Sequence, residues 1–247
     1  MSSRVQPAQQ APPLQKLRIR YAKRGRARFT SSRDFGRAFE RALRRAQVPM
    51  AYSSGFSPHP RISYANASPT GAASEAEYLE IGLTEECDPE RVCVALDAAL
   101  PPGLDVVDVV VSAPGALADL LTASRWQIAV PGVPPDVLRA AIAQLLAAES
   151  VVVERLTKSG LRAFDVRPAV VSLVADVSLV AGDTADPPLI LLVTKHQEPL
   201  VRPDDVLTAL AQLVPGFAPA QVPVVTRLSQ GRLDVESGCI VEPFARR

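Results

Sequence analysis

Arginine is the residue type whose number and spacing in this chain point most clearly to a chemical role. Residues 1–61 contain 14 lysines and arginines against only Asp34 and Glu40, a net charge of +12. The remaining 186 residues hold 13 basic and 24 acidic side chains, a net charge of −11, although the whole chain carries only +1. A basic segment of this density favours binding to a polyanion, because cations spaced along a surface release counterions from phosphates. The alternative is a solvated basic face that keeps the protein in solution.

The predicted contact set consists mostly of arginines, which bind phosphate through two parallel hydrogen bonds and also stack on bases. Its members are Arg18, Arg20, Arg24, Arg26, Arg28, Arg33, Arg37, Arg41, Arg61 and Phe56, with Lys23 among them in the sequence. Three aromatic residues close by, Tyr52, Phe56 and Tyr64, are candidates for stacking on unpaired bases. The alternative is packing in the core, which we expect for Tyr64 because it falls in a predicted strand; for Phe56, in a loop, the two interpretations are balanced.

A loop rich in glycine and proline, Gly55 to Arg61, carries one of the two histidines of the chain. Pro58 and Pro60 stiffen the loop, so it has a shape that could present His59 as a general acid or base, since the ordinary pKa of an imidazole is about 6.5. The alternative is a turn residue that bonds to the backbone, and we favour it because no nucleophile or base partner accompanies His59. The other histidine, His196, is expected at the end of an apolar strand.

Several classes of function lack their sequence signals. The chain contains no GxxxxGK(S/T) loop for nucleotides, no GxGxxG motif after a strand and no GxSxG elbow. Two histidines and three cysteines without CxxC spacing predict neither a metal site nor a bound cofactor. An odd number of cysteines without a secretion signal indicates a cytoplasmic protein with reduced thiols. No apolar run reaches the roughly 18 residues that span a bilayer, so no membrane contact is expected.

Residues 14–112 alternate between strand and helix patterns. The apolar positions of 17–22 follow the period of two of a half-buried strand, and those of 35–46 follow the period of a helix whose other face is rich in arginine. The remaining elements are strands at 61–65, 77–83 and 104–111 and a helix that begins at Asp88-Pro89. The order β-α-β-β-α-β predicts an α+β fold, a ferredoxin-like domain with an antiparallel sheet.

The same order of elements recurs at 124–235, after a linker at 113–123. The patterns predict strands at 125–130, 151–158, 188–196 and 223–233, helices that begin at Pro134 and Pro203, and a region at 161–180 that we do not divide between strands and a helical turn. The sequence therefore predicts two tandem ferredoxin-like domains, with extra residues between the middle strands of the second one. Residues 1–13 are expected to form a disordered tail, and 236–247 a second tail.

Asp165 and Arg167, in the segment Asp165-Val166-Arg167-Pro168, would share one side of an extended chain. We favour a structural ion pair at the end of a strand over a functional role for these two residues.

Motifs spread over residues 17–83 carry a family resemblance. They are Arg28-Phe29, Asp34-Phe35, Arg41-Ala42, Arg44-Arg45-Ala46, Pro49, Tyr52-Ser53, Gly55-Phe56, Pro58, Pro60-Arg61-Ile62-Ser63, Gly71, Ser74 and Glu77-Tyr78. With these motifs, and with the segment at 165–168, the chain resembles the DUF2344 family, the radical SAM-linked proteins of bacteria. The resemblance implies a radical SAM enzyme, encoded as a separate chain, as partner. One departure is Ser31-Ser32-Arg33-Asp34, where family members often have a histidine, so a catalytic role of that histidine could not operate here.

Three hypotheses follow. The first is an RNA-binding accessory protein without catalysis of its own, which works with a radical SAM enzyme in RNA modification or maturation. The second is an RNA-processing or RNA-modifying enzyme that uses His59 with Asp34 or Tyr64, which requires these groups to converge. The third is a protein-binding scaffold for the radical SAM partner.

Overall fold

The computed structural model describes residues 9–157, 160–176 and 187–244. The chain divides into two compact units, Met1–Asp119 and Leu120–Arg247, each with two α-helices and antiparallel strands. Parts of the predicted tails (1–8 and 245–247), of the strand at 151–158 (158) and of the region at 161–180 (177–180) lie outside the described residues.

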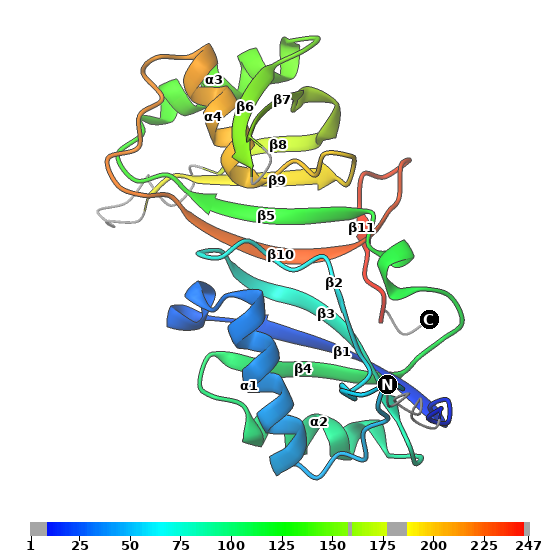
Figure 1. The fold of residues 1–247 in the computed structure, drawn as a ribbon. Helices are drawn as coiled ribbons and strands as arrows, with labels where there is room; N and C mark the ends of the chain where they lie inside the picture. The colour runs from blue at the N-terminus through cyan, green and yellow to red at the C-terminus, as the bar shows by residue number, and fades with distance from the viewer. Residues whose placement is uncertain (1–8, 158–159, 177–186, 245–247) are drawn as a thin grey trace, which may run out of the picture. The chain divides into compact units, whose positions relative to one another are not determined.

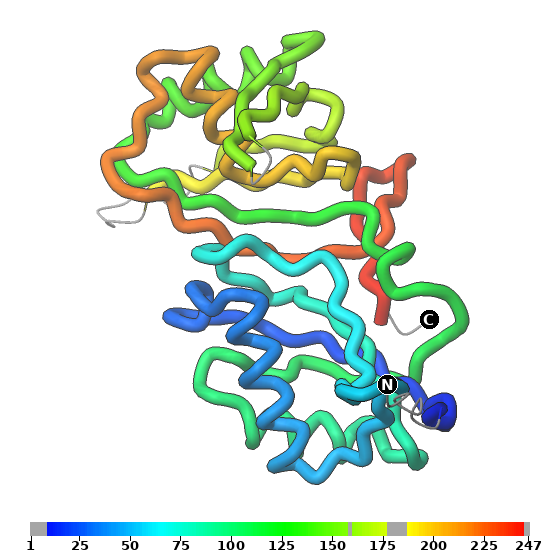
Figure 2. Tube along the Cα trace, viewed as in Figure 1, coloured from blue at the N-terminus to red at the C-terminus, as the bar shows by residue number. Residues whose placement is uncertain are grey.

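The first unit follows the predicted order of elements (Figure 1). They are β1 (Gln15–Lys23), a 3-10 helix (Gly25–Phe29), α1 (Ser32–Arg45), β2 (Ile62–Ala65), β3 (Ala73–Leu83), α2 (Pro89–Ala99) and β4 (Leu104–Val111). β1 pairs with β4 on one side and with β3 on the other, and β2 pairs with the far side of β3, all antiparallel. The strand order in this unit is therefore β4-β1-β3-β2, and Figure 2 traces β1 between β3 and β4.

The core of the first unit lies between one face of these strands and the two helices. The apolar positions of β1 alternate, so they all face α1 and α2, and the apolar stripe of α1 faces back. Its large buried members include Leu17, Ile19, Tyr21, Phe35, Phe39, Leu43, Leu79, Ile81, Leu83, Leu96 and Leu104. The rings of Tyr21 and Phe35 stack with their centroids 4.2 Å apart, which fixes α1 over β1.

Both helices of the first unit begin at a side-chain cap, and the second begins at Asp88 as the sequence predicts. Ser31 Oγ accepts the Asp34 N–H at 3.2 Å and donates to the Asp34 carboxylate at 2.7 Å. Asp88 accepts the Glu90 N–H at 2.9 Å, at the start of α2. Caps of this kind contribute about 1 kcal/mol each, and they define where each helix starts.

The second unit contains more strands than the first. Its elements are β5 (Ala123–Ala129), α3 (Pro135–Ala147), β6 (Val152–Thr157), β7 (Gly160–Asp165), a 3-10 helix (Arg167–Ala169), β8 (Val170–Asp176), β9 (Leu189–Lys195), α4 (Pro203–Leu213), β10 (Val224–Leu233) and β11 (Ile240–Val241). β5 pairs with β10 and β9, and β8 pairs with the far side of β9, in the order β10-β5-β9-β8. β11, in the predicted C-terminal tail, pairs with β10.

Between α3 and β9 the described residues form three strands, β6, β7 and β8, and the predicted strand among them is not the one that pairs with β9. The strand predicted at 151–158 is β6, which forms a hairpin with β7, while β8 pairs with β9. A period of two reveals a strand but not its partner, because the partner depends on contacts distant in sequence. The hairpin contacts α4 through Arg155, whose Nη1 lies 2.7 Å from Asp205 Oδ2.

Asp165 and Arg167 lie at the end of β7 and bond to the backbone. The Asp165 carboxylate accepts the N–H groups of Val151 and Arg167, both at 2.9 Å. Arg167 donates to the carbonyl oxygens of Val170 at 3.2 Å and Leu146 at 3.1 Å. Their role in the fold is to fasten the turn between β7 and β8 to the end of α3.

The architecture is α+β, with four α-helices in the described part of the chain and antiparallel pairing between the strands. Of the helices in the described residues, none has the length and apolar character that crossing a bilayer requires.

Candidate nucleic-acid interface

The outer face of α1 carries five exposed side chains that we call the α1 arginine face: Arg33, Arg37, Arg41, Arg44 and Arg45. They point outward because the apolar stripe on the opposite side of α1 packs against the core. Positions four apart are neighbours on a helix, so four of the five form a row about 18 Å long. Across residues 9–157, 160–176 and 187–244 none of the five forms an ion pair, and the hydrogen bond found for them joins Arg45 Nη1 to Ala99 O at 3.2 Å.

Repulsion within the row of Arg33, Arg37, Arg41 and Arg45 works against the stability of α1, although Arg44 and Arg45 lie in the last turn, where the helix dipole favours a cation. Each pair of like charges at i and i+4 destabilises a helix by about 0.2–0.5 kcal/mol, so the three such pairs together cost about 1 kcal/mol. Arg33 lies in the first turn, where the helix dipole disfavours a cation. The other helices lack such a row: α4 carries two aspartates in its first turn and no basic residue. A row of unpaired guanidinium groups suits the binding of phosphate.

The arginines of β1 lie on the other side of the strands. Since the apolar residues of β1 face the helices, Arg18 and Arg20 point away from α1. Arg18 is only 2% exposed. Its Nε lies 3.2 Å from Glu80 Oε2, and its Nη2 donates to Ala113 O at 2.9 Å and Gly115 O at 2.6 Å. Arg18 thus holds the segment after β4 against β1, and the structure does not bring it to the α1 arginine face.

Arg20 and Arg24 bond to one segment of β3. Arg20 is half-buried and its Nε donates to Glu75 O at 2.9 Å. Arg24 forms ion pairs with Glu75 and, through Nη1, with Asp105 Oδ2 at 2.9 Å. Two carboxylates therefore neutralise Arg24 locally.

The remaining predicted arginines flank α1 in the sequence. Arg26 is exposed in the 3-10 helix before α1. Arg28 is half-buried, with its Cζ 4.7 Å from the centroid of the exposed Phe29 ring. Arg61 is half-buried and its Nε donates to Tyr52 O at 3.1 Å. Of these three side chains, Arg26 is the one most open to a ligand.

The predicted loop at 55–61 is exposed and stabilised through its backbone. Phe56 is 66% exposed. The His59 N–H donates to Ser53 Oγ at 3.0 Å, and the Ser53 N–H donates to His59 O at 2.8 Å. The imidazole itself is exposed, and among the residues that the structure describes neither Asp34 nor Tyr64 bonds to it. The geometry matches a turn residue and not an assembled acid–base pair.

Tyr64 is the aromatic residue whose placement differs most from expectation. Its ring makes an edge-to-face contact with Phe35, with centroids 6.0 Å apart, yet the residue is 46% exposed. It is exposed because β2 is short and pairs only with β3 in this unit, so α1 covers the ring from one side. Burial, with the charge of Glu40, raises the pKa of Tyr64 to about 12.

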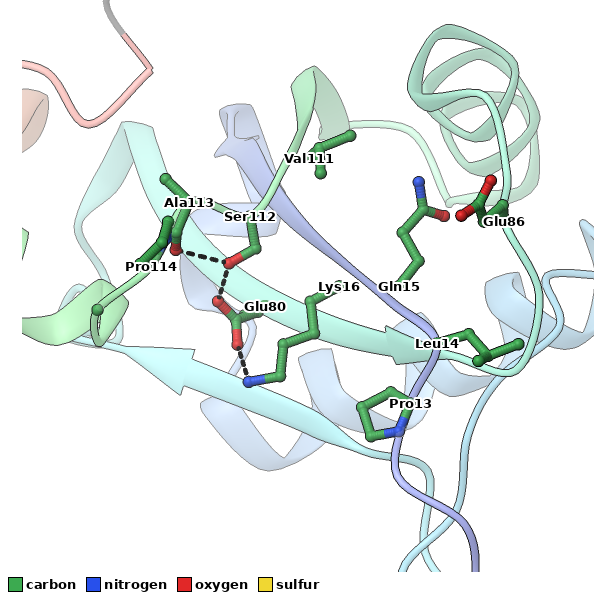
Figure 3. A pocket seen from close by; sticks show the side chains of 11 residues that line it. Pro13, Leu14, Gln15, Lys16, Glu80, Glu86, Val111, Ser112, Ala113 and Pro114 are labelled. Atoms are coloured by element: carbon green, nitrogen blue, oxygen red, sulfur yellow. Dashed lines mark hydrogen bonds and ion pairs between the residues drawn. The ribbon is translucent and has the colours of Figure 1, made fainter.

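A hollow of about 680 Å³ lies in the first unit around Lys16 of β1 (Figure 3). Within it Glu80 accepts hydrogen bonds from Lys16 Nζ at 3.0 Å and from Ser112 Oγ at 2.7 Å. Burial alone would raise the pKa of Glu80, but the bonds from Ser112, Lys16 and Arg18 outweigh it and lower the pKa. The polar groups here hold β1, β3 and the end of β4 together.

A histidine–serine pair in the second unit has no counterpart in the sequence prediction. His196 follows β9, as expected for a strand-end residue, and its Nε2 lies 2.9 Å from Ser124 Oγ while its Nδ1 lies 2.6 Å from Leu121 O. Because a carbonyl only accepts, Nδ1 carries the proton in the neutral ring. Ser124 is 1% exposed, so its hydroxyl is closed to a substrate. The partners are 72 residues apart, and no local pattern signals their contact.

We expect His196 to make the folded protein sensitive to mild acid. Burial lowers the pKa of His196 below the ordinary 6.5, the Leu121 carbonyl opposes this, and Arg227 lowers it further. As the pH falls, the unfolded chain therefore takes up the proton before the folded one. The contribution of His196 to the free energy of unfolding is fully present above about pH 7, and it is lost as the pH drops through about 6.5 toward the pKa of His196 in the folded protein. Chemical unfolding between pH 5 and pH 8 (about 1.5 units to either side of 6.5) measures this change in the free energy of unfolding.

The control for this prediction is the exposed histidine. His196→Gln should remove this part of the pH dependence, whereas His59→Gln should retain it. A wild-type stability that stays flat across the range, or an equal change in both variants, would contradict the assignment.

In the part of the chain that the structure describes, no three His, Cys, Asp or Glu side chains gather into a group that could hold a metal ion. Cys87 and Cys93 are half-buried, Cys239 is exposed, and all three are free thiols.

Comparison with known proteins yields a family. The model of DUF2344, described as an uncharacterized protein conserved in bacteria, matches residues 16–203. No curated protein matches the chain. The matched range runs from the second residue of β1 through β9, includes α1 and its arginines, and reaches the start of α4. Because it covers well over half of the sequence, the chain belongs to the DUF2344 family.

Proposed function

We propose that the chain is an RNA-binding accessory protein whose α1 arginine face contacts the phosphates, and that it performs no catalysis itself. The observation that carries the proposal is the row of exposed guanidinium groups that find no acidic partner among the described residues. The row costs helix stability, and contact with a polyanion would offset that cost. Arg26, exposed just before α1, extends the proposed surface.

The proposal also describes both units as ferredoxin-like domains. The strand orders β4-β1-β3-β2 and β10-β5-β9-β8, with two helices in each unit, support this description. The hairpin of β6 and β7 is then an addition between the first helix and the second strand of the second domain.

The partner in this proposal is a radical SAM enzyme, encoded as a separate chain, that acts in RNA modification or maturation in the cytoplasm. The resemblance of residues 17–83 to radical SAM-linked proteins and the membership of the DUF2344 family support it. The chain would hold the RNA while the partner performs the chemistry.

Fluorescence anisotropy of a labelled RNA oligonucleotide, titrated with the full chain at several salt concentrations, tests the proposal. If all five arginines contact phosphates of a single strand, log Kobs should fall against log salt with a slope of about −3.5, at roughly 0.7 per contact. Absence of binding at low salt, or an affinity independent of salt, would refute it. A variant of the α1 arginine face that binds RNA normally but no longer retains the radical SAM enzyme would indicate a protein scaffold instead.

A further inference from the structure

The flank of α1 next to β2 presents an aromatic ring beside the α1 arginine face. Tyr64 lies in β2 on the helix side of the strands, held edge-to-face by Phe35 of α1 and still 46% exposed. Its Oη lies beside Gly36, and Arg33 lies one turn before Gly36 on the same flank of the helix. The ring thus lies on the flank of α1 that adjoins the α1 arginine face, and Glu40, one turn after Gly36, is a charged neighbour of the ring.

Gly36 leaves the hydroxyl end of the Tyr64 ring without a covering side chain from this position of α1. A glycine inside a helix costs about 1 kcal/mol relative to alanine. Packing does not require it, since a Cβ at position 36 would lie 3.4 Å from Tyr64 Oη, an ordinary contact. A larger side chain would extend over the ring. The helix therefore bears a second cost, besides the arginine row, at the position that leaves Tyr64 accessible.

We infer that the RNA bound by the α1 arginine face is single-stranded and that an unpaired base stacks on Tyr64. The inference rests on the proposed function and names the substrate class of the same site. A duplex keeps its bases stacked inside, so an exposed ring at the side of a phosphate-binding helix gains nothing from it. Every unpaired base, whatever the sequence, has a flat aromatic face that can stack on such a ring, as in single-strand-binding proteins. The phenol is uncharged near pH 7 even at its ordinary pKa of about 10, so it does not repel the phosphates.

The test compares three probes: a single-stranded RNA of about 16 nucleotides, the upper end of known single-strand site sizes, its duplex, and an abasic strand of equal length. Tyr64→Leu keeps an apolar side chain against Phe35 but removes the ring, and Tyr64→Phe keeps the ring. Gly36→Leu covers the ring without changing Tyr64 or any arginine, and Gly36→Ala is its matched control.

We expect Tyr64→Leu and Gly36→Leu to weaken binding of the normal single strand by about 5- to 150-fold, the range for loss of one stacked base. Tyr64→Phe and Gly36→Ala should bind like the wild type. The abasic strand and the duplex should bind the wild type more weakly and be insensitive to position 64. The salt slope should stay unchanged in the Tyr64 variants, because stacking releases no counterions.

Two outcomes overturn the inference: equal wild-type affinity for all three probes, or normal single-strand affinity in Tyr64→Leu. Circular dichroism tests whether each variant is folded, and Gly36→Leu provides an independent reading if Tyr64→Leu fails to fold. The triple variant Arg33→Glu/Arg37→Glu/Arg41→Glu distinguishes failure of the stacking inference from failure of the proposed RNA binding. If it alone loses affinity, RNA binding stands and only the stacking inference falls; if it binds every probe like the wild type, the proposed function falls.

Discussion

Reversing three charges of the α1 arginine face, in Arg33→Glu/Arg37→Glu/Arg41→Glu, should lower RNA affinity by about 100-fold or more. Loss of three exposed hydrogen bonds between arginine and phosphate, at about 1 kcal/mol each, weakens the binding free energy by about 3 kcal/mol. Each 1.4 kcal/mol corresponds to about a tenfold change in affinity. Repulsion between the new carboxylates and phosphate adds to this loss. Fluorescence anisotropy with a labelled RNA oligonucleotide measures the affinity.

Loss of structure would not explain such a result. The substitutions exchange two arginine pairs four residues apart for two glutamate pairs with similar repulsion, and they turn the pair at 41 and 45 into an attractive Glu–Arg pair. They also place an anion in the first turn of α1, where the helix dipole favours it. We therefore expect the stability of the fold to stay equal or to rise slightly. The matched control is Arg91→Glu/Arg125→Glu/Arg139→Glu, three exposed arginines of other elements with the same change in net charge. An equal loss of affinity in the control would mean that only net charge matters.

Asp205→Ala should destabilise the protein by about 3 kcal/mol, because removal of one partner from a buried ion pair leaves the other unpaired. Asp205 Oδ2 lies 2.7 Å from Arg155 Nη1 and accepts the Arg202 N–H at 2.7 Å. Arg155 is held over the Phe164 ring at 4.8 Å and would keep its charge without a carboxylate. Urea unfolding followed by circular dichroism measures the change.

The net contribution of this pair is smaller than the loss from a single substitution. Burial raises the pKa of Asp205, and the hydrogen bond from the Arg202 backbone and the charge of Arg155 oppose that rise without cancelling it. Arg155→Leu/Asp205→Leu should therefore cost less than the sum of the single changes. The exposed pair of Arg162 and Glu198, at 3.5 Å, is the control, and Arg162→Ala should cost at most about 1 kcal/mol. If the free-energy changes of the two single substitutions at Arg155 and Asp205 add up to that of the double variant, the coupling between the two residues is contradicted.

Local patterns were sufficient to predict α1 and its surroundings. The apolar spacing of 35–46 defines which side of the helix is buried, and the arginines follow on the other side. The caps at Ser31 and Asp88 were predictable because their hydrogen bonds reach only two or three residues along the chain. The same reasoning, applied to β1, would have separated Arg18 and Arg20 from the α1 arginines, since alternation places them opposite the core face.

Other features depend on partners that no local pattern names. Leu156 and Leu161 face each other in a hairpin whose pairing only the structure reveals. The exposure of Tyr64 depends on β2 being short and on Gly36 in a different element. His196 and Ser124 meet only because β5 and β9 are neighbours.

The counterion release caused by α1 is the most direct measure of its contact with phosphate. Log Kobs for a single-stranded RNA should be recorded against log salt for the wild type, the α1 triple variant and the control triple variant. Three lost phosphate contacts should make the slope of the α1 variant shallower by about 2, at roughly 0.7 per contact, while the control keeps the wild-type slope. An α1 variant with the wild-type slope, or an equal change in both variants, would contradict RNA binding at α1.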